Sequence, residues 1–494
     1  MSANESQQPH DGEETKDFRG RATSGAAWVG VGHVVQQVVR VVSNLILTRL
    51  LLEEHFGLMA LVTVVLVGIH LISDIGISAA LVQNKRHDRA FVDTIWTLGI
   101  MRGFGLFLIA IALAGPVGTF YGEPVLIDLI KVSSLTALID ACRSTNYHTA
   151  KRNLQVRGIV MLDVGSQVVG VVVMVVWASI VPSVWALVGG GLTTSLVAAV
   201  WTWALPGPRN HFHFERRAAW TLYHFGRWIM VNTMLSFLAS NMDRIIFGKL
   251  VTMAALGVYN IGLNLALVPS TVISRLSGGI MFPLYSRFHH KGAPMQPIYR
   301  NARLPLLVLG GWATAGIVAG GPTIIELLYD PRYIEAGWIL QILVVGLWFG
   351  LALDSSNQVA LIALGHTRWT AISGASKVAG MAALIPLGWH FGGFLGAMLG
   401  LAGSDFLRYL LSTIGVLQFG LDGRSQDLKM TLLVAASAFA AWFAVQLLIQ
   451  LGWTSVVLHA LFIALIVTAM WSPQFLKLWR QHRDTGYLFF EEGS

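Results

Sequence analysis

Polar side chains recur along one face of the first long apolar segment, at every third or fourth position. They are His33, Gln37, Arg40, Asn44 and Thr48. This spacing places all five on one face of an α-helix. Charged and hydrogen-bonding groups are costly against lipid, so the stripe must face water, a bound molecule or a polar partner helix. A cavity is favoured here over a partner helix.

Further ionisable residues lie inside apolar segments, where an ionised group usually faces a cavity. Three pairs of opposite charge are spaced three residues apart and can neutralise themselves locally: Asp128/Lys131, Asp140/Arg143 and Asp405/Arg408. Four cations have no acid close by on the same helix: Arg40, Arg102, Arg275 and Lys377. Charges in the half of their segment nearest the cytoplasm are Asp74, Arg102, Arg143, Arg275, Asp354 and Lys377.

These charges predict a cationic chamber that opens to the cytoplasm and accepts an anionic headgroup, because guanidinium groups match phosphate oxygens bidentately. The predicted binding residues are His33, Gln37, Arg40, Asn44, Arg102, Arg143, Arg275, Lys377 and Arg408. Asp74 and Asp354 are the candidates for ion coupling, since neither has a cation three or four residues away on its own helix. A fixed salt bridge from these aspartates to Arg102 or Lys377 is the alternative.

The composition is that of a membrane protein. The chain has 494 residues, of which 54% are hydrophobic and only 12% charged, against the ~25% charged residues of soluble domains. Soluble enzymes and nucleic-acid binders are therefore excluded. Cys142 is the single cysteine, which excludes an internal disulfide and any multi-thiolate metal site. Residues 1–25 are polar and show no signal peptide, so we expect a solvated cytoplasmic tail.

Apolar segments long enough to span a bilayer occur fourteen times. They cover roughly residues 26–51, 56–83, 94–114, 125–150, 159–180, 186–204, 225–248, 256–282, 304–319, 336–362, 369–390, 394–419, 430–451 and 456–470. The predicted fold is an all-α polytopic membrane protein of about 14 transmembrane helices, with two six-helix lobes in parallel repeat and two C-terminal helices. The predicted domains are 1–25, 26–204, 205–224, 225–419, 430–470 and 471–494.

The loops carry an asymmetric charge. With the N-terminus in the cytoplasm, nearly all loop lysines and arginines fall on the cytoplasmic side, and the other side receives only Arg49, Lys249 and Arg332. Cytoplasmic loops of membrane proteins show this excess of cations, so both termini are predicted to be cytoplasmic. The longest connection, residues 205–224, is basic and aromatic, as is typical of an interfacial helix joining two lobes.

The two halves share an internal repeat. At a shift of 200 residues, Arg49 falls on Lys249 and Gly57 on Gly257; at a shift of 211, Asn146 falls on Asn357 and Arg157 on Arg368. Parallel repeats with a substrate site between them are typical of transporters.

No catalytic or nucleotide motif is present. The chain lacks G-x-x-x-x-G-K-[ST], H-E-x-x-H and G-x-S-x-G. His211, His213, His289 and His290 lie in loops, where solvation or the lipid interface is favoured over metal binding. Glu53 and Glu54 would suit a membrane glycosyltransferase, but a solvated turn at a helix start is favoured. We expect no enzyme activity, no cofactor and no metal.

The sequence resembles a known family. The run LTRLLLEEHFGLMALVTVVLVGIHLISDIGISAALVQ, then TIWTLGIMRG, and later NMDRIIFGKLVTMAALGVYNIGLNLAL are similar to the polysaccharide transporter branch of the multidrug/oligosaccharidyl-lipid/polysaccharide exporter superfamily. The resemblance spans about residues 20–420 and is greatest to Wzx-type flippases of the colanic-acid-like subgroup. It implies two six-helix bundles around a central cavity, and transfer of undecaprenyl-pyrophosphate-linked oligosaccharides between leaflets.

The sequence therefore predicts a flippase that moves such repeat units across the bacterial cytoplasmic membrane by alternating access, for exopolysaccharide or O-antigen assembly. Its expected partners are the polyprenyl-pyrophosphate-linked oligosaccharide and membrane lipids, with H+ or Na+ and a polysaccharide polymerase as further candidates and no nucleic acid. The alternatives are an ion-coupled drug exporter of the same fold, a membrane glycosyltransferase or polymerase, and a scaffold for polysaccharide assembly.

Overall fold

The computed structural model describes residues 11–73, 89–152 and 155–484. These ranges are almost entirely helical, and eleven helical stretches within them are long and apolar enough to cross a membrane. The predicted all-helical membrane fold is thus confirmed. The chain divides into two compact units that meet inside one helix, between Met234 and Leu235. We call residues up to Met234 unit 1 and the remainder unit 2; the finer domain bounds predicted from the sequence stay a prediction.

Unit 1 consists of a long first helix and a packed group behind it. Its helices are α1 (Asp11–Leu50), α2 (Glu53–Ile72), α4 (Arg89–Tyr121), α5 (Val125–Ser133), α6 (Leu135–Ala141), α7 (Asn146–Arg152), α8 (Val156–Ile180), α9 (Val184–Ala204) and the start of α10 (Arg216–Leu250). The fourth predicted span, residues 125–150, is broken into α5, α6 and α7. This break places a set of polar side chains at helix ends within the unit.

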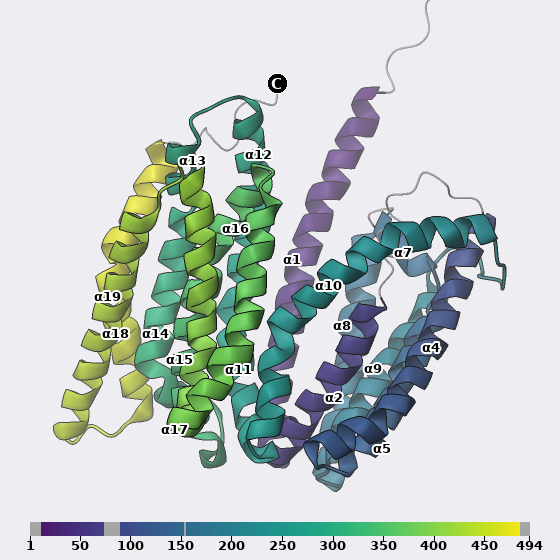
Figure 1. Cartoon of the computed structure of the whole chain (residues 1–494), viewed down its shortest axis with the longest axis horizontal. Helices are drawn as coiled ribbons and strands as arrows, with labels where there is room; N and C mark the ends of the chain where they lie inside the picture. The colour runs from purple at the N-terminus through teal and green to yellow at the C-terminus, as the bar shows by residue number, and fades with distance from the viewer. Residues whose placement is uncertain (1–10, 74–88, 153–154, 485–494) are drawn as a thin grey trace, which may run out of the picture. The chain divides into compact units, whose positions relative to one another are not determined.

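Unit 2 begins within α10. Its other helices are α11 (Met253–Leu276), η1 (Ser277–Met281), α12 (Phe282–His290), α13 (Met295–Ala302), α14 (Leu304–Leu328), η2 (Pro331–Tyr333), α15 (Ala336–Leu347), η3 (Trp348–Leu353), α16 (Asp354–Ala363), α17 (Thr367–Gln418), α18 (Arg424–Gln450) and α19 (Val456–Asp484). Figure 1 shows α14, α15, α17, α18 and α19 running side by side.

One predicted boundary in unit 2 is corrected by the structure, and two predicted spans are confirmed. The helix α14 continues to Leu328, beyond the predicted end at residue 319, because Pro322 lies inside the helix rather than ending it; membrane helices tolerate such prolines. The predicted spans 369–390 and 394–419 are confirmed: they are the two helical halves of α17, separated by non-helical backbone at Gly392 and Gly393. Gly393 has a φ of +56°, which favours glycine.

The connection after α9 is helical in only part of the predicted linker 205–224. Residues 205–215 are non-helical, and α10 begins at Arg216. Pro206 and Pro208 explain this, because proline lacks a backbone N–H and disrupts a helix interior. The segment is fastened to α4 by backbone N–H groups that donate to side chains: His211 to Asp93, His213 to Thr97 and Glu215 to Thr94, each at 3.1 Å.

The element boundaries repeat at the shifts found in the sequence. Helices α1 and α10 end at Leu50 and Leu250, and the helices that follow begin at Glu53 and Met253, a shift of 200 residues. Helices α8 and α17 begin at Val156 and Thr367, a shift of 211. The helical order of the two halves therefore matches the internal repeat.

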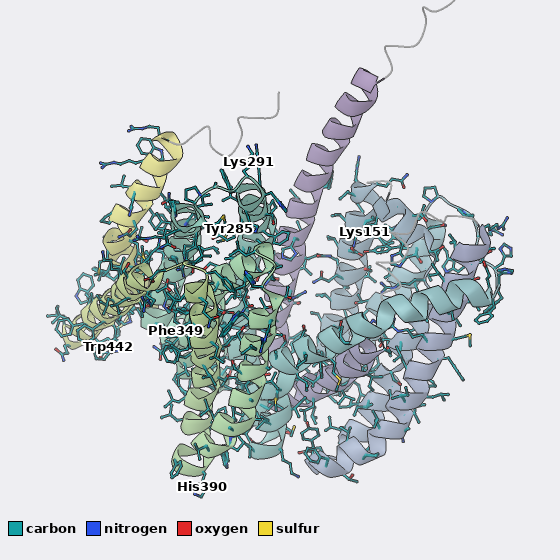
Figure 2. The ribbon with its side chains drawn as sticks, turned by 45° about the horizontal axis from the view of Figure 1, so that its top comes forward. Lys151, Tyr285, Lys291, Phe349, His390 and Trp442 are labelled. Carbon is teal, nitrogen blue, oxygen red and sulfur yellow. The ribbon has the colours of Figure 1, made fainter. Side chains whose placement is uncertain are left out.

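Several lysines and arginines of unit 2 lie at helix ends on one side of the unit. They include Lys291, Arg300, Arg368 and Arg424. Figure 2 shows Lys291 and His390 at opposite ends of the unit. We call the end of unit 2 with these cations the basic end.

Candidate functional site

The two halves of α17 form a hairpin whose backbones nearly touch. A Cβ atom at Gly388 would overlap the carbonyl oxygen of Gly396, and one at Gly400 would overlap the carbonyl oxygen of Leu384. Small residues permit this close approach between membrane helices. As a consequence, Lys377 on the first half reaches a carboxylate on the second half.

Two ion pairs of unit 2 join helical segments that are far apart in the sequence. Lys377 Nζ lies 2.8 Å from Asp405 Oδ1, and Arg408 Nε lies 2.8 Å from Asp354 Oδ2. The predicted Asp405/Arg408 pair is therefore wrong, since each residue pairs with a closer partner on another segment. The alternative proposed for Asp354, a bridge to Arg102 or Lys377, is also corrected: its partner is Arg408.

Local backbone geometry explains where the Asp405 carboxylate lies. It rests on Gly350 in the π-helical stretch η3, where a Cβ atom would overlap it. Phe349 beside it packs on Phe406 and Tyr409, with ring centroids 5.0 and 5.9 Å apart. Phe349 is visible in Figure 2. The glycine thus makes room for a carboxylate within an otherwise apolar contact.

Asp354 is fully buried and has a second partner besides Arg408. Gln358 Nε2 donates to both carboxylate oxygens, at 3.1 and 3.2 Å, and to Ser373 Oγ at 2.7 Å. A buried carboxylate needs such compensation. The predicted role of Asp354 in ion coupling stays a prediction; the structure adds that this carboxylate is already paired.

A second buried ion pair lies nearer the basic end and was missed in the sequence. Arg303 was counted among the loop cations, yet its side chain is 0% exposed and lies 2.6 Å from Asp427 Oδ1. The Arg303 guanidinium also lies 4.8 Å from the centroid of the Tyr299 ring. Tyr409 donates its hydroxyl to Asp427 Oδ2 at 2.8 Å. The one available signal was the spacing of four residues from Tyr299 to Arg303, which brings them onto one helix face.

Asn357 extends this cluster into the hairpin. Its Nδ2 donates to Ser412 Oγ at 3.1 Å and to Thr413 Oγ1 at 3.2 Å, and its Oδ1 accepts from the Tyr299 hydroxyl at 2.5 Å. We call the combined set the unit 2 polar core. It consists of Tyr299, Arg303, Asp354, Asn357, Gln358, Lys377, Asp405, Arg408, Tyr409 and Asp427.

Unit 1 contains a polar cavity of about 240 Å³, which we call the unit 1 pocket. Its lining includes His70, Trp96, Arg102, Asp140, Arg143 and Tyr147. Two of the predicted binding residues, Arg102 and Arg143, are thus brought to one cavity. Trp96 forms part of the wall and donates its indole N–H to the Arg143 carbonyl at 3.1 Å.

The two arginines of the unit 1 pocket are held differently. Arg102 donates to Ser73 Oγ at 3.0 Å and to the His70 carbonyl at 2.7 Å, so it binds the end of α2. Arg143 lies 2.7 Å from Asp140, which confirms that predicted pair, and the two side chains are 34% and 39% exposed. Within the described residues, Arg143 Nε is buried and has no hydrogen-bond partner. Arg143 nevertheless lines the pocket and its side chain is partly exposed, so a bound anion can reach the guanidinium group.

The predicted stripe on α1 lies beside the face that packs on α8. Gly32 contacts Val160, and the Gln36 carbonyl accepts from Gln167 Nε2 at 3.2 Å. The last stripe residue, Thr48, is buried. The others are half-buried or, in one case, exposed: His33, Gln37 and Asn44 are half-buried and Arg40 is exposed.

Two predicted residues are not placed. Asp74 lies outside the described residues, and Arg275 lies in α11 with its side chain outside them. The predicted Asp128/Lys131 pair is formed at 3.8 Å. Among the residues described, no group of three or more His, Cys, Asp or Glu side chains could hold a metal ion.

Known proteins match this chain over most of its length. WzxC of Escherichia coli K12, a lipopolysaccharide biosynthesis protein, is 21% identical over 80% of both chains, and TuaB of Bacillus subtilis 168, a teichuronic acid biosynthesis protein, is 21% identical over 69% of this chain and 71% of its own. Among solved structures, the lipid II flippase MurJ in an inward closed conformation aligns with a TM-score of 0.72, at 10% identity, over 91% of this chain and 99% of MurJ.

A multidrug resistance MATE family transporter aligns with a TM-score of 0.60, at 10% identity, over 82% of this chain and 99% of that protein. These two structures show a fold of the superfamily that includes MATE transporters. The homologues are transporters and flippases, not enzymes. The polysaccharide biosynthesis protein family matches residues 46–388, so this chain belongs to that family and is a multi-pass membrane transport protein of polysaccharide biosynthesis.

Proposed function

We propose that the chain flips undecaprenyl-pyrophosphate-linked oligosaccharides across the bacterial cytoplasmic membrane by alternating access, with both termini in the cytoplasm. The observation that carries this proposal is the unit 1 pocket, where Arg102 and Arg143 meet in one polar cavity. Family membership and the MurJ-like fold agree with it. A pyrophosphate presents several anionic oxygens, which suit guanidinium donors.

The unit 1 pocket suggests how a pyrophosphate binds. Arg102 is fixed by the end of α2 and supplies a positioned charge. Arg143 is balanced by a partly exposed Asp140, and its own side chain is partly exposed in the pocket. An arriving phosphate oxygen replaces part of that ion pair, so the exchange leaves no buried charge without a partner. The polar stripe on α1 binds sugar hydroxyls, and the polyprenyl chain stays in lipid.

The proposal is tested by flipping in proteoliposomes, with a fluorescent undecaprenyl-pyrophosphate oligosaccharide and a membrane-impermeant quencher. Arg143→Gln and Arg102→Gln should each slow flipping by about tenfold or more, the effect of losing ~1.4 kcal/mol of binding. Lys131→Gln is the matched control, because Lys131 also pairs with an aspartate three residues away but does not line the pocket. Native rates in both pocket variants would overturn the proposal.

The stripe on α1 has its own test. Arg40 is exposed and has no same-helix acid close by. Arg40→Ala should abolish polymer export with normal membrane insertion, whereas Arg40→Lys should retain part of it, since an ammonium loses the bidentate geometry. Normal export by a well-expressed Arg40→Ala variant removes Arg40 from the proposed site.

Energy coupling is tested in the same proteoliposomes with an imposed proton or sodium gradient. The native protein is compared with Asp74→Asn and Asp354→Asn. Equal stimulation of all three proteins excludes both aspartates as the coupling site, and no stimulation of any protein leaves product removal by a downstream polymerase as the driving force. A cationic drug in place of the lipid tests the exporter alternative, and its transport with no flipping would select that function.

A further inference from the structure

A cationic cavity lies at the basic end of unit 2, and neither the unit 1 pocket nor the unit 2 polar core contributes a residue to its lining. It has a volume of about 540 Å³ and lies where α13, α14, α18 and α19 meet. Three cations line it, Arg300, Lys429 and Lys477, together with the amides of Asn301, Gln426 and Gln474. No carboxylate is among the described lining residues. We call this cavity the α18–α19 pocket.

One wall of the α18–α19 pocket is preformed. Gln296 Nε2 donates to the Asp422 carbonyl at 2.8 Å, and the Asp422 N–H donates to Gln296 Oε1 at 2.8 Å. Gln426 Nε2 donates to the Arg300 carbonyl at 3.2 Å. These bonds fasten α13 to the start of α18, so the cations converge on a built cavity and not on a loose surface.

A buried acceptor in the same cavity has no partner. The Oε1 atom of Gln426 is buried and accepts no hydrogen bond from the described residues. Buried polar atoms in native proteins are normally satisfied. Because Gln426 lines the cavity, a rotation of its side chain would present this oxygen to a hydroxyl group of a bound ligand.

The surroundings of the pocket are those of a lipid headgroup site. Its floor is apolar, formed by Leu304, Met430 and Leu433. Large apolar side chains of α18 and α19 next to it are exposed, namely Leu428, Leu432, Leu476 and Trp479. In a membrane protein such residues face acyl chains, and tryptophan is enriched at the level of the headgroups. Phosphate-binding cations therefore lie directly beside a surface that accepts lipid tails.

We propose that the α18–α19 pocket binds an anionic glycerophospholipid of the surrounding membrane, with its phosphate on Arg300, Lys429 and Lys477 and a headgroup hydroxyl on Gln426. Basic pockets between transmembrane helices on the cytoplasmic side bind anionic headgroups in this manner. The site is separate from the unit 1 pocket and does not depend on the proposed substrate.

Lipid binding to the purified full-length protein is measured by native mass spectrometry, with phosphatidylglycerol and phosphatidylethanolamine as probes. The native protein should retain phosphatidylglycerol in preference to the zwitterionic lipid. The triple variant Arg300→Gln/Lys429→Gln/Lys477→Gln should weaken phosphatidylglycerol binding by about a hundredfold, and each single variant by about fivefold, given ~1 kcal/mol for each cation. Gln426→Leu should also weaken phosphatidylglycerol binding, and it should affect the binding of phosphatidic acid less, because that lipid has no headgroup hydroxyl.

The control variant is Arg287→Gln/Lys291→Gln/Arg368→Gln, which removes the same charge from exposed cations of the basic end that do not line the pocket. It should bind phosphatidylglycerol as the native protein does. Equal affinity of the two triple variants would overturn the proposal. The proposal would also be overturned if the Arg300→Gln/Lys429→Gln/Lys477→Gln variant lost undecaprenyl pyrophosphate binding but bound phosphatidylglycerol as the native protein does. Displacement of the bound lipid by millimolar inorganic phosphate would overturn it as well. The single variants provide the test if the triple variant does not yield monodisperse protein.

Discussion

The unit 1 pocket and the unit 2 polar core use the same residue types in opposite ways. In unit 1, Arg143 pairs with Asp140 on its own chain segment, and both side chains are partly exposed to a cavity. In unit 2, Arg408 pairs with Asp354 from another helix, and that carboxylate is 0% exposed. The repeat sharpens this contrast, because a shift of 211 residues places Asp354 at the position of Arg143.

The difference teaches that partner choice, not residue type, separates a binding charge from a structural one. An exposed pair loses little when a ligand replaces one member. A buried pair costs several kcal/mol when one member is removed, because the other charge is left without compensation. We therefore propose ligand binding for the unit 1 pocket and helix positioning for the unit 2 polar core.

The largest effect is expected at Arg303. Arg303→Met leaves the Asp427 carboxylate buried and unpaired, which should cost about 3–5 kcal/mol and lower the melting temperature by roughly 6–20 °C. The double variant Arg303→Met/Asp427→Leu should recover most of this loss. Thermal denaturation in detergent, followed by intrinsic fluorescence, measures both. A native melting temperature in the single variant would show that the core is not structural.

A smaller effect separates the observed pairing from the one predicted along the helix. Lys377→Gln and Asp405→Asn should each destabilise by about 1–3 kcal/mol, and the double variant of these two should regain more than half of the summed loss. Asp405→Asn/Arg408→Gln breaks two different pairs and should show no such recovery. The reverse result in the same melting assay would favour the pairing predicted from the sequence.

Unit 1 should respond less in stability. Asp140→Asn and Arg143→Gln remove a partly exposed pair, so each should cost less than about 1 kcal/mol. The Arg143 variant should nevertheless lose flipping in proteoliposomes. If Arg143→Gln destabilised the protein as much as Lys377→Gln does, Arg143 would be a structural charge. The proposed difference between the two units would then be wrong.

The smallest effect is expected at Asp422, which is not buried. Hydrogen bonds from the Arg424 side chain and backbone lower the pKa of the Asp422 carboxyl. The stabilisation is therefore present above the unfolded-state pKa of about 3.9 and is lost as the pH falls through the lowered folded value. At pH 6 the melting temperature of Asp422→Asn should lie at most about one degree below that of the native protein. This difference in melting temperature should shrink below pH 4. A difference that widens in acid would contradict this.

The membrane-spanning segments could be predicted well from the sequence, because every spanning helix needs an apolar stretch long enough to cross the bilayer. The prediction of a helix was wrong at residues 205–215, because the basic and aromatic composition was considered without the helix-breaking effect of Pro206 and Pro208. The end of α14 was missed for the opposite reason, since Pro322 lies inside a helix.

Site prediction failed where partners come from distant segments. Spacing correctly paired Asp140 with Arg143, because both residues belong to one turn. It wrongly paired Asp405 with Arg408, because the glycine contacts of α17 and η3 bring closer partners that no local pattern reveals. Arg303 was assigned to a loop since it precedes an apolar run, and its partner Asp427 lies far along the chain.

The glycine seam of α17 has a mechanical consequence. Because Gly388, Gly396 and Gly400 leave no room for a side chain between the two halves, neither half can rotate about its axis without driving one backbone into the other. The hairpin therefore moves as one rigid body, and the Lys377–Asp405 ion pair moves with it unbroken. During transport the hairpin must therefore tilt as a whole. The distance between two labels, one on each half of α17, should stay constant at every stage of turnover.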